Sequence, residues 1–116
     1  MTQEEFIKVL DKKDYSYKIE RDRIIVTHEE SVDLELLTSI PHGVVFNNGG
    51  YVYLNSLTSF YPGVVFNNDG KVYLGYLIAG RSYGMDGWLD DWKCNIKGID
   101  NKRLLNVMIS KGIFER

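Results

Sequence analysis

Residues 37–54, LTSIPHGVVFNNGGYVYL, are followed after two residues by a second copy of the same stretch at residues 57–74, LTSFYPGVVFNNDGKVYL. Of the 18 aligned positions 13 are identical, and the offset between the copies is 20 residues. Repeats of this length are typical of stacked architectures, in which one unit cannot bury its apolar face alone and its neighbours cover it. Such proteins usually act as binding surfaces, so the repeat favours binding over catalysis.

The periodicity extends beyond the two clear copies. Shifting the alignment by one period in either direction adds degenerate copies, and the repeats then span about residues 23–80. Five apolar rows result: Ile24, Val44 and Val64; Val26, Phe46 and Phe66; Val32, Val52 and Val72; Leu34, Leu54 and Leu74; and Leu37, Leu57 and Leu77. Five aligned rows predict a continuous core, with atypical units at both ends. Asn47 with Asn67, and Asn48 with Asn68, are expected to form side-chain amide ladders at the corners.

Length and composition bound the class of protein. A chain of 116 residues suits a single domain with one core. The formal net charge of −2 gives no overall field that favours nucleic acid or an anionic membrane. Cys94 is the only cysteine, which excludes an internal disulfide framework. The sequence also lacks an apolar run of about 18 residues and opens MTQEEF, without a signal-peptide stretch. We therefore expect a cytoplasmic protein without a membrane segment.

Residues 1–22 are predicted to cap the first repeat. Thr2 and Glu5 have the spacing of a capping box, in which each side chain accepts from a backbone N–H of the other. The apolar residues that follow fall on one helical face, namely Phe6, Val9 and Leu10. Residues 15–26 alternate around a polar turn at Glu20, Arg21 and Asp22, which predicts two short strands.

Two geometries fit the repeats at 23–80. Apolar residues alternate on either side of an Asn-Asn-Gly or Asn-Asn-Asp-Gly corner, which suits strands. In a solenoid, each repeat is one coil and equivalent strands stack in parallel. In the alternative, Asn48-Gly49 closes an antiparallel hairpin and such hairpins form a row. Residues 57–60 supply a third apolar side that only the solenoid needs. The predicted fold is mainly β with α caps, a short three-coil β-solenoid like that of leucine-rich-repeat proteins.

Residues 81–116 are predicted to form a loop and a helical C-terminal cap. The helix is expected to begin after Asp100 and to end at Gly112. Its apolar stripe, predicted to pack on the last repeat, consists of Leu104, Leu105, Met108 and Ile109.

The sequence of the repeats resembles that of a known family. The stretches at 37–54 and 57–74 are similar to the LTSLPxGVxFNNGGxVYL repeats of leucine-rich-repeat-like proteins of gut bacteria and their phages. The stretch IIVTHEESVDLELLTSIP and the tail NIKGIDNKRLLNVMISKGIFER resemble the ends of such proteins. The resemblance implies a solenoid with a short helical C-terminal cap. It implies no activity and no site residues. Tyr61-Pro62 departs from the pattern by one place relative to Pro41.

Catalytic groups are sparse. The two histidines, His28 and His42, are out of register in the repeat, and His42 stands where the next copy has Pro62. Cys94 has no histidine or electropositive pocket assigned to it, as a reactive thiol would need. Metal-ligand spacings and a phosphate-binding glycine loop are absent from the sequence. The sequence therefore predicts no enzyme, no metal and no cofactor.

A binding surface has better support. The outward positions Ile25, Val45 and Val65 are apolar, although outward strand positions in water usually carry polar residues. Tyrosines at outward or neighbouring positions are predicted beside this row, namely Tyr51, Tyr53, Tyr61, Tyr73 and Tyr76. Valines and tyrosines together resemble the core of a protein interface. The alternatives are that a cap covers the row, or that it pairs with itself in a homodimer.

Carbohydrate and nucleic acid are the two other partner classes that the sequence suggests. Trp88 and Trp92 beside Asp86, Asp90 and Asp91 suit carbohydrate binding, although acidic residues in a glycine-containing loop are usually solvated. Residues 92–116 carry six basic and two acidic side chains, but these are spread along a helix, so nucleic acid is disfavoured. The predicted function is a protein-binding module acting through the Val/Tyr positions. In its specific form it is a phage-encoded inhibitor of a host defence protein, such as an anti-CRISPR.

Overall fold

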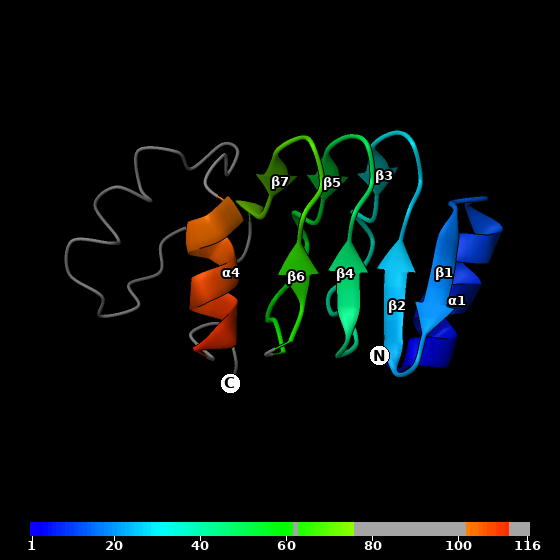
Figure 1. Ribbon diagram of the computed structural model, residues 1–116, viewed down its shortest axis with the longest axis horizontal. Coiled ribbons are helices and arrows are strands. Elements are labelled where there is room, and N and C mark those ends of the chain that lie inside the picture. Colours follow the sequence, from blue (N-terminus) through cyan, green and yellow to red (C-terminus); the bar gives the residue numbers. More distant parts are fainter. Residues whose placement is uncertain (62, 76–101, 112–116) are drawn as a thin grey trace.

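The computed structural model describes residues 1–61, 63–75 and 102–111. Within them, two helices and two small sheets give a mixed α/β fold (Figure 1). The helices are α1 (Gln3–Lys12) and α4 (Lys102–Ser110). The strands are β1 (Tyr17–Glu20), β2 (Arg23–Val26), β3 (Val32–Asp33), β4 (Val44–Phe46), β5 (Val52–Tyr53), β6 (Val65–Phe66) and β7 (Val72–Tyr73).

The strands pair one repeat apart. Sheet A has the order β1-β2-β4-β6, and sheet B has the order β3-β5-β7. Strands β1 and β2 are antiparallel, and every other pair is parallel and joins residues 20 apart. The predicted rows Val26/Phe46/Phe66 and Val32/Val52/Val72 are confirmed in register, as is the pair Ile24/Val44. Leu77 lies outside the described residues.

The alternative row of antiparallel hairpins is wrong for these repeats. Val44–Phe46 and Val52–Tyr53 belong to different sheets and do not pair with each other. A two-residue hairpin turn of the favoured type needs positive φ at both central residues. In the described residues, positive φ occurs at Asp14, Arg21, Gly43 and Gly63, and not at Asn48 or Gly49. The Asn-Asn-Gly segment therefore turns the chain from one sheet to the other.

Each repeat buries three sides. On β4, Val44 and Phe46 are buried while Val45 is half-buried, which confirms the predicted alternation. The rings of Phe46 and Phe66 stack at a centroid distance of 4.8 Å with an angle of 3°. The third apolar side is also buried, at Ile40 in one repeat and at Leu57 and Phe60 in the next. Equivalent apolar side chains thus pack on one another along the whole stack.

The corner asparagines bond differently from the prediction. Asn48 is buried, and its Nδ2 donates to the carbonyls of Glu30, Gly50 and Tyr51 at 3.1–3.2 Å. Asn68 Nδ2 likewise donates to the carbonyls of Gly50 and Gly70. These bonds run to backbone oxygens of the same and the preceding repeat. The expected bond between the amides of Asn48 and Asn68 is not formed, because the Nδ2 groups donate to carbonyls and neither Oδ1 accepts a hydrogen bond from the described residues.

The N-terminal elements fit the prediction. Helix α1 begins with the expected capping box, in which Thr2 N–H donates to Glu5 Oε1 at 3.0 Å and Glu5 N–H donates to Thr2 Oγ1 at 3.1 Å. The bond from the Thr2 N–H holds the pKa of the Glu5 carboxyl below its usual range. Phe6 and Leu10 are buried, and the Phe6 ring meets the Phe46 ring edge-on at 6.5 Å. Helix α1 thereby closes the apolar interior at this end.

Side chains also form hydrogen bonds that hold the first strands and α1 to the repeats. Tyr15 Oη accepts the Asp33 N–H at 2.9 Å, on the side of β3 that has no strand partner within the described chain. Gln3 Nε2 donates to the carbonyls of Asp22 and His42 at 2.6 and 3.0 Å. Tyr17 Oη donates to Asp11 Oδ1 at 2.8 Å, and this bond raises the pKa of Tyr17. The hairpin and α1 are thus bound to the stack by polar contacts as well as by apolar ones.

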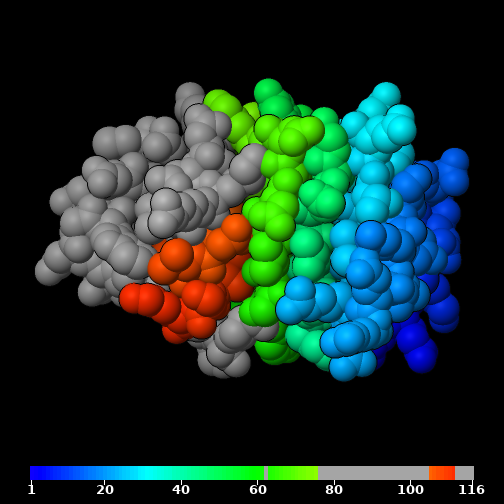
Figure 2. Space-filling view, in the orientation of Figure 1, coloured from blue at the N-terminus to red at the C-terminus, as the bar shows by residue number. Residues whose placement is uncertain are grey.

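Helix α4 lies against the other end of sheet A. Among its described side chains Leu105, Met108 and Ile109 are buried, while the predicted stripe residue Leu104 lies outside the described side chains. Figure 2 shows the surface of α4 in orange directly beside the green repeats. Asn106 Oδ1 accepts the Phe66 N–H at 2.8 Å, and Asn106 Nδ2 donates to the Phe66 carbonyl at 2.9 Å. One carboxamide therefore occupies the place that the backbone of a further strand would take on β6.

We expect Asn48→Asp to destabilise the fold by about 3 kcal/mol, because it removes three donated hydrogen bonds and turns a carboxylate towards carbonyl oxygens. The matched control is Asn47→Asp, because Asn47 is exposed one position earlier, and its effect should stay within about 0.5 kcal/mol. Urea unfolding measures both. Equal losses for the two variants would contradict the bonding described for Asn48.

We expect Asn106→Ala to lower the free energy of unfolding by about 2 kcal/mol, because it strands one donor and one acceptor of Phe66. Amide exchange at Phe66 should accelerate selectively. Ser110→Ala is the control, because the Ser110 hydroxyl bonds only within its own helix, to the Val107 carbonyl. Unchanged protection of the Phe66 amide in Asn106→Ala would show that another group closes this edge.

Candidate binding surfaces

The outer face of sheet A carries an apolar row. The strand register places Ile25, Val45 and Val65 side by side on β2, β4 and β6, with Lys18 of β1 opposite Ile25. The three aliphatic side chains are half-buried. The predicted alternation therefore places the three aliphatic side chains on one face of sheet A, side by side along the strand order.

Charged groups flank the β1 end of this row. Lys18 Nζ lies 2.9 Å from Glu20 Oε2, and both side chains are more than half exposed. A hollow of about 650 Å³ at this place is lined by Glu20, Arg21, Arg23 and Ile25. An exposed ion pair of this kind contributes less than about 1 kcal/mol. Its two partners are therefore able to pair with other charges at little cost.

Sheet B carries a cluster of three tyrosines on its outer face. The Tyr53 and Tyr73 rings stack at 5.1 Å with an angle of 9°. The Tyr51 ring lies 6.1 Å from that of Tyr53 and 5.8 Å from that of Tyr73, inclined to both. Tyr51 is 39% exposed, and the other two are half-buried. The aromatic residues predicted at these three positions therefore form one contiguous patch.

The valines and the tyrosines do not form one ladder. Val45 and Val65 lie on sheet A, whereas Tyr53 and Tyr73 lie on sheet B, beyond the Asn-Asn-Gly corner. The prediction that the two sets lie beside each other is corrected accordingly, because the corner turns the chain between them. The chain presents two surfaces, one aliphatic and one aromatic, and each needs its own test.

Contacts between repeats fix the aromatic surface. A Cβ atom on Gly70 would overlap the Tyr51 ring, so the ring packs directly on the backbone of the next repeat. The Tyr51 N–H donates to Ser31 Oγ at 2.8 Å. Further along, Asn55 donates through its N–H and its Nδ2 to the two carboxylate oxygens of Glu35, and the Gly75 N–H donates to Asn55 Oδ1. The platform beneath the rings is therefore held in place before any partner binds.

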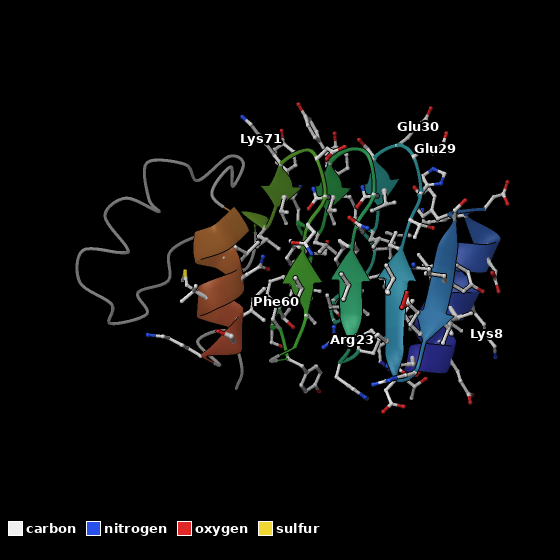
Figure 3. The ribbon with its side chains drawn as sticks, in the orientation of Figure 1. Lys8, Arg23, Glu29, Glu30, Phe60 and Lys71 are labelled. Atoms are coloured by element: carbon white, nitrogen blue, oxygen red, sulfur yellow. The ribbon has the colours of Figure 1, made fainter. Side chains whose placement is uncertain are left out.

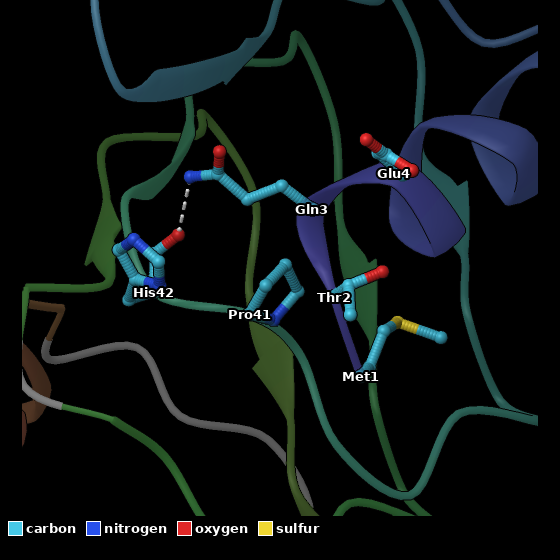
Figure 4. Close-up of a pocket in the computed structure, with 6 residues that line it drawn as sticks. All are labelled: Met1, Thr2, Gln3, Glu4, Pro41 and His42. Atoms are coloured by element: carbon cyan, nitrogen blue, oxygen red, sulfur yellow. Dashed lines mark hydrogen bonds between the residues drawn. The ribbon is translucent and has the colours of Figure 1, made fainter.

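The two histidines occupy separate places. The His42 carbonyl accepts from Gln3 Nε2, and His42 lines a hollow of about 560 Å³ with Pro41 and the first four residues (Figure 4). His28 Nδ1 accepts the Ser16 N–H at 3.3 Å, and its ring lies 4.8 Å from that of Tyr15. Within the described chain neither imidazole bonds a carboxylate or a hydroxyl, the arrangement that nucleophilic catalysis uses.

Other predicted residues lie outside the described ones. They are Tyr76 of the tyrosine set, Cys94, the carbohydrate candidates Trp88, Trp92, Asp86, Asp90 and Asp91, and the helix boundaries Asp100 and Gly112. Expectations for them stay predictions. Across residues 1–61, 63–75 and 102–111, no three His, Cys, Asp or Glu side chains come together as a group able to hold a metal ion. Neither of the helices described there is long and apolar enough to cross a bilayer.

The sequence patterns did not predict two polar residues of these surfaces. Asp33 is the register partner of Tyr53, and Glu35 bonds Asn55 from the same edge. A 20-residue shift applied to polar as well as apolar positions would have found both. Asn106 has no such signal, because it lies in a helix outside the repeats and bonds a strand 40 residues away.

Comparison with protein-family models, with curated proteins and with solved structures finds no match to this chain. The surfaces themselves therefore carry the functional argument.

We expect Gly70→Ala to displace the Tyr51 ring and to destabilise the fold by about 1–3 kcal/mol through overpacking. In a Tyr51→Ala background the same change should cost about 1 kcal/mol less, because the clash with the ring is gone. A double-mutant cycle by urea unfolding measures this coupling. Additive effects would place the ring away from Gly70.

Proposed function

We propose that the chain is a non-enzymatic protein-binding module whose 20-residue repeats form a short β-solenoid of three coils with helical caps. Parallel pairing at a constant offset of 20 residues supports the solenoid, as does the burial of a third side at Ile40 and Phe60. The resemblance of the repeats to leucine-rich-repeat-like proteins points the same way. Cys94 is the sole cysteine of the chain, which suits the reducing cytoplasm, and we propose that the protein acts there.

The outward aliphatic row carries this proposal. Three strands present Ile25, Val45 and Val65 in one register on the outer face of sheet A, where polar side chains are usual in water. Each side chain is already half-buried, so complete burial under a partner contributes about 1 kcal/mol per residue. The tyrosine patch on sheet B adds aromatic area whose ordering costs little, because the rings already contact one another.

In its specific form, we propose a phage-encoded inhibitor of a host defence protein, such as an anti-CRISPR. The support is the small size of the chain, the sparse catalytic groups and the setting of the resembling repeats. Inhibition of DNA cleavage by purified candidate nucleases tests this form. Absence of both binding and inhibition across those nucleases would remove it and leave the general binding function standing.

The surfaces are tested separately by affinity capture from host lysate, followed by calorimetry with the purified partner. One variant carries Val45→Lys and Val65→Lys, and the other carries Tyr53→Ala and Tyr73→Ala. We expect the lysine variant to weaken binding by at least about 100-fold, since two charges would be buried without partners.

The matched control carries Ile19→Lys and Leu36→Lys. These residues are apolar and 57% and 89% exposed. Ile19 pairs with the buried Ile24, so it lies on the other face of sheet A from the row, and Leu36 lies outside the strands. Equal affinity of the lysine variant and the control would contradict the proposed interface. A homodimer through the row is the competing outcome: light scattering would then give twice the chain mass of 13.4 kDa for the wild type and the monomer mass for the lysine variant.

A further inference from the structure

The outer face of sheet B has a regular arrangement of side chains. Register and alternation place on this face one residue of each two-residue strand, together with the residues two positions before and after it in the chain. They are Ser31, Asp33 and Glu35 at the β3 edge, then Tyr51, Tyr53 and Asn55, then Lys71, Tyr73 and Gly75. The middle row therefore reads Asp33, Tyr53, Tyr73. Two of its three places hold stacked rings, and the third holds a short carboxylate.

The stack of rings ends at Tyr53. One face of the Tyr53 ring is covered by Tyr73 at 5.1 Å, which is close to the spacing of neighbouring strands. Its other face is directed towards the β3 column, where the row carries Asp33 instead of a third ring. Tyr51 does not occupy that side, because its ring packs on Gly70 and against Tyr73. A planar group placed above Asp33 would continue the stack by one more layer.

The charge at this place selects a cation. Asp33 is exposed, and its Oδ1 accepts the Glu35 N–H at 3.0 Å, which fixes the carboxylate. Among the described residues, the face and its upper corner carry five carboxylates and one ammonium, a formal balance of −4, from Glu29, Glu30, Asp33, Glu35, Asp69 and Lys71. Figure 3 shows Glu29, Glu30 and Lys71 along this same upper edge. A guanidinium is planar, stacks on aromatic rings and forms two parallel hydrogen bonds with a carboxylate. An ammonium pairs with a carboxylate only as a point charge and has no flat face to stack.

We propose that this surface binds an arginine side chain of the protein partner, stacked on the face of Tyr53 that is turned towards the β3 column and paired with Asp33. The inference rests on the proposed protein-binding function and adds the chemistry of the partner: a basic segment that presents arginine to sheet B. The acidic corner attracts such a segment at long range, so its binding weakens as salt is added.

The probe is the blocked peptide N-acetyl-Gly-Arg-Gly-amide, titrated at constant ionic strength into the full chain and followed by amide chemical shifts in ¹H–¹⁵N spectra. We expect saturable shifts centred on Asp33 and Tyr53. The citrulline peptide, which keeps the planar shape without the charge, should bind about tenfold more weakly, a difference of ~1.4 kcal/mol. The lysine peptide should fall between the two.

Two variants assign the contacts. Asp33→Asn keeps the oxygen that accepts the Glu35 N–H and removes the charge, and Tyr53→Leu keeps apolar volume and removes the ring. Each should weaken the arginine peptide at least about fivefold, within the range of a single cation–π or ion-pair contact. Glu4→Gln removes one exposed charge from the start of α1 and should leave the affinity unchanged. The spectra also report whether each variant is folded.

Equal binding of the arginine and citrulline peptides, shifts centred elsewhere, or full affinity in Asp33→Asn would overturn the arginine site. Preferential binding of neutral oligosaccharides at the tyrosines would do the same and would assign the patch to sugars. The proposed function fails by a different result, namely a partner complex insensitive to Val45→Lys and Val65→Lys. The failure of the arginine site is therefore distinguishable from the failure of the proposed function.

Discussion

Backbone pairing at a constant offset of 20 residues is the constraint on which the rest of the structure depends. The strands are two to four residues long, and such short strands are stable only when several are packed on a common core. Because paired residues stand one repeat apart, each apolar side chain meets its own equivalent, as Phe46 meets Phe66. The same constraint places Tyr53 on Tyr73 outside the core. The interior and the outer surfaces are thus products of one register.

A stack of this kind leaves backbone groups at its ends that cannot pair with a further repeat. At the first end, β1 pairs antiparallel with β2 and becomes the edge strand of sheet A, and Tyr15 supplies an oxygen to the edge of β3. At the other end of sheet A, the carboxamide of Asn106 pairs with both polar groups of Phe66. Groups bonded in this way at β3 and β6 are not available to strands from other chains.

Much of this architecture was predictable, because the 20-residue period is visible in the amino-acid sequence. The offset identified the pairing partners, and alternation separated Val44 and Phe46 from Val45. The capping box at Thr2 and Glu5 marked the first helix. The bonding of Asn48 was not predictable in this way, since a carboxamide has two donors and an acceptor and its partners depend on the path of the corner. The separation of the valines from the tyrosines also depends on that corner. The bonding of Asn106 to Phe66 depends on where α4 packs against sheet A, and no local sequence pattern indicates that position.

The corner amides give the stack a direction. Asn48 reaches back to the Glu30 carbonyl, and Asn68 reaches back to the Gly50 carbonyl, so each buried donor finds an acceptor in the repeat that precedes it. During synthesis the preceding repeat leaves the ribosome first. An asparagine that emerges later then finds the carbonyls of the preceding repeat already synthesised. The other acceptors of these amides, the Gly50 and Tyr51 carbonyls for Asn48 and the Gly70 carbonyl for Asn68, follow in the same repeat. Each corner amide therefore joins its own repeat to the one made before it.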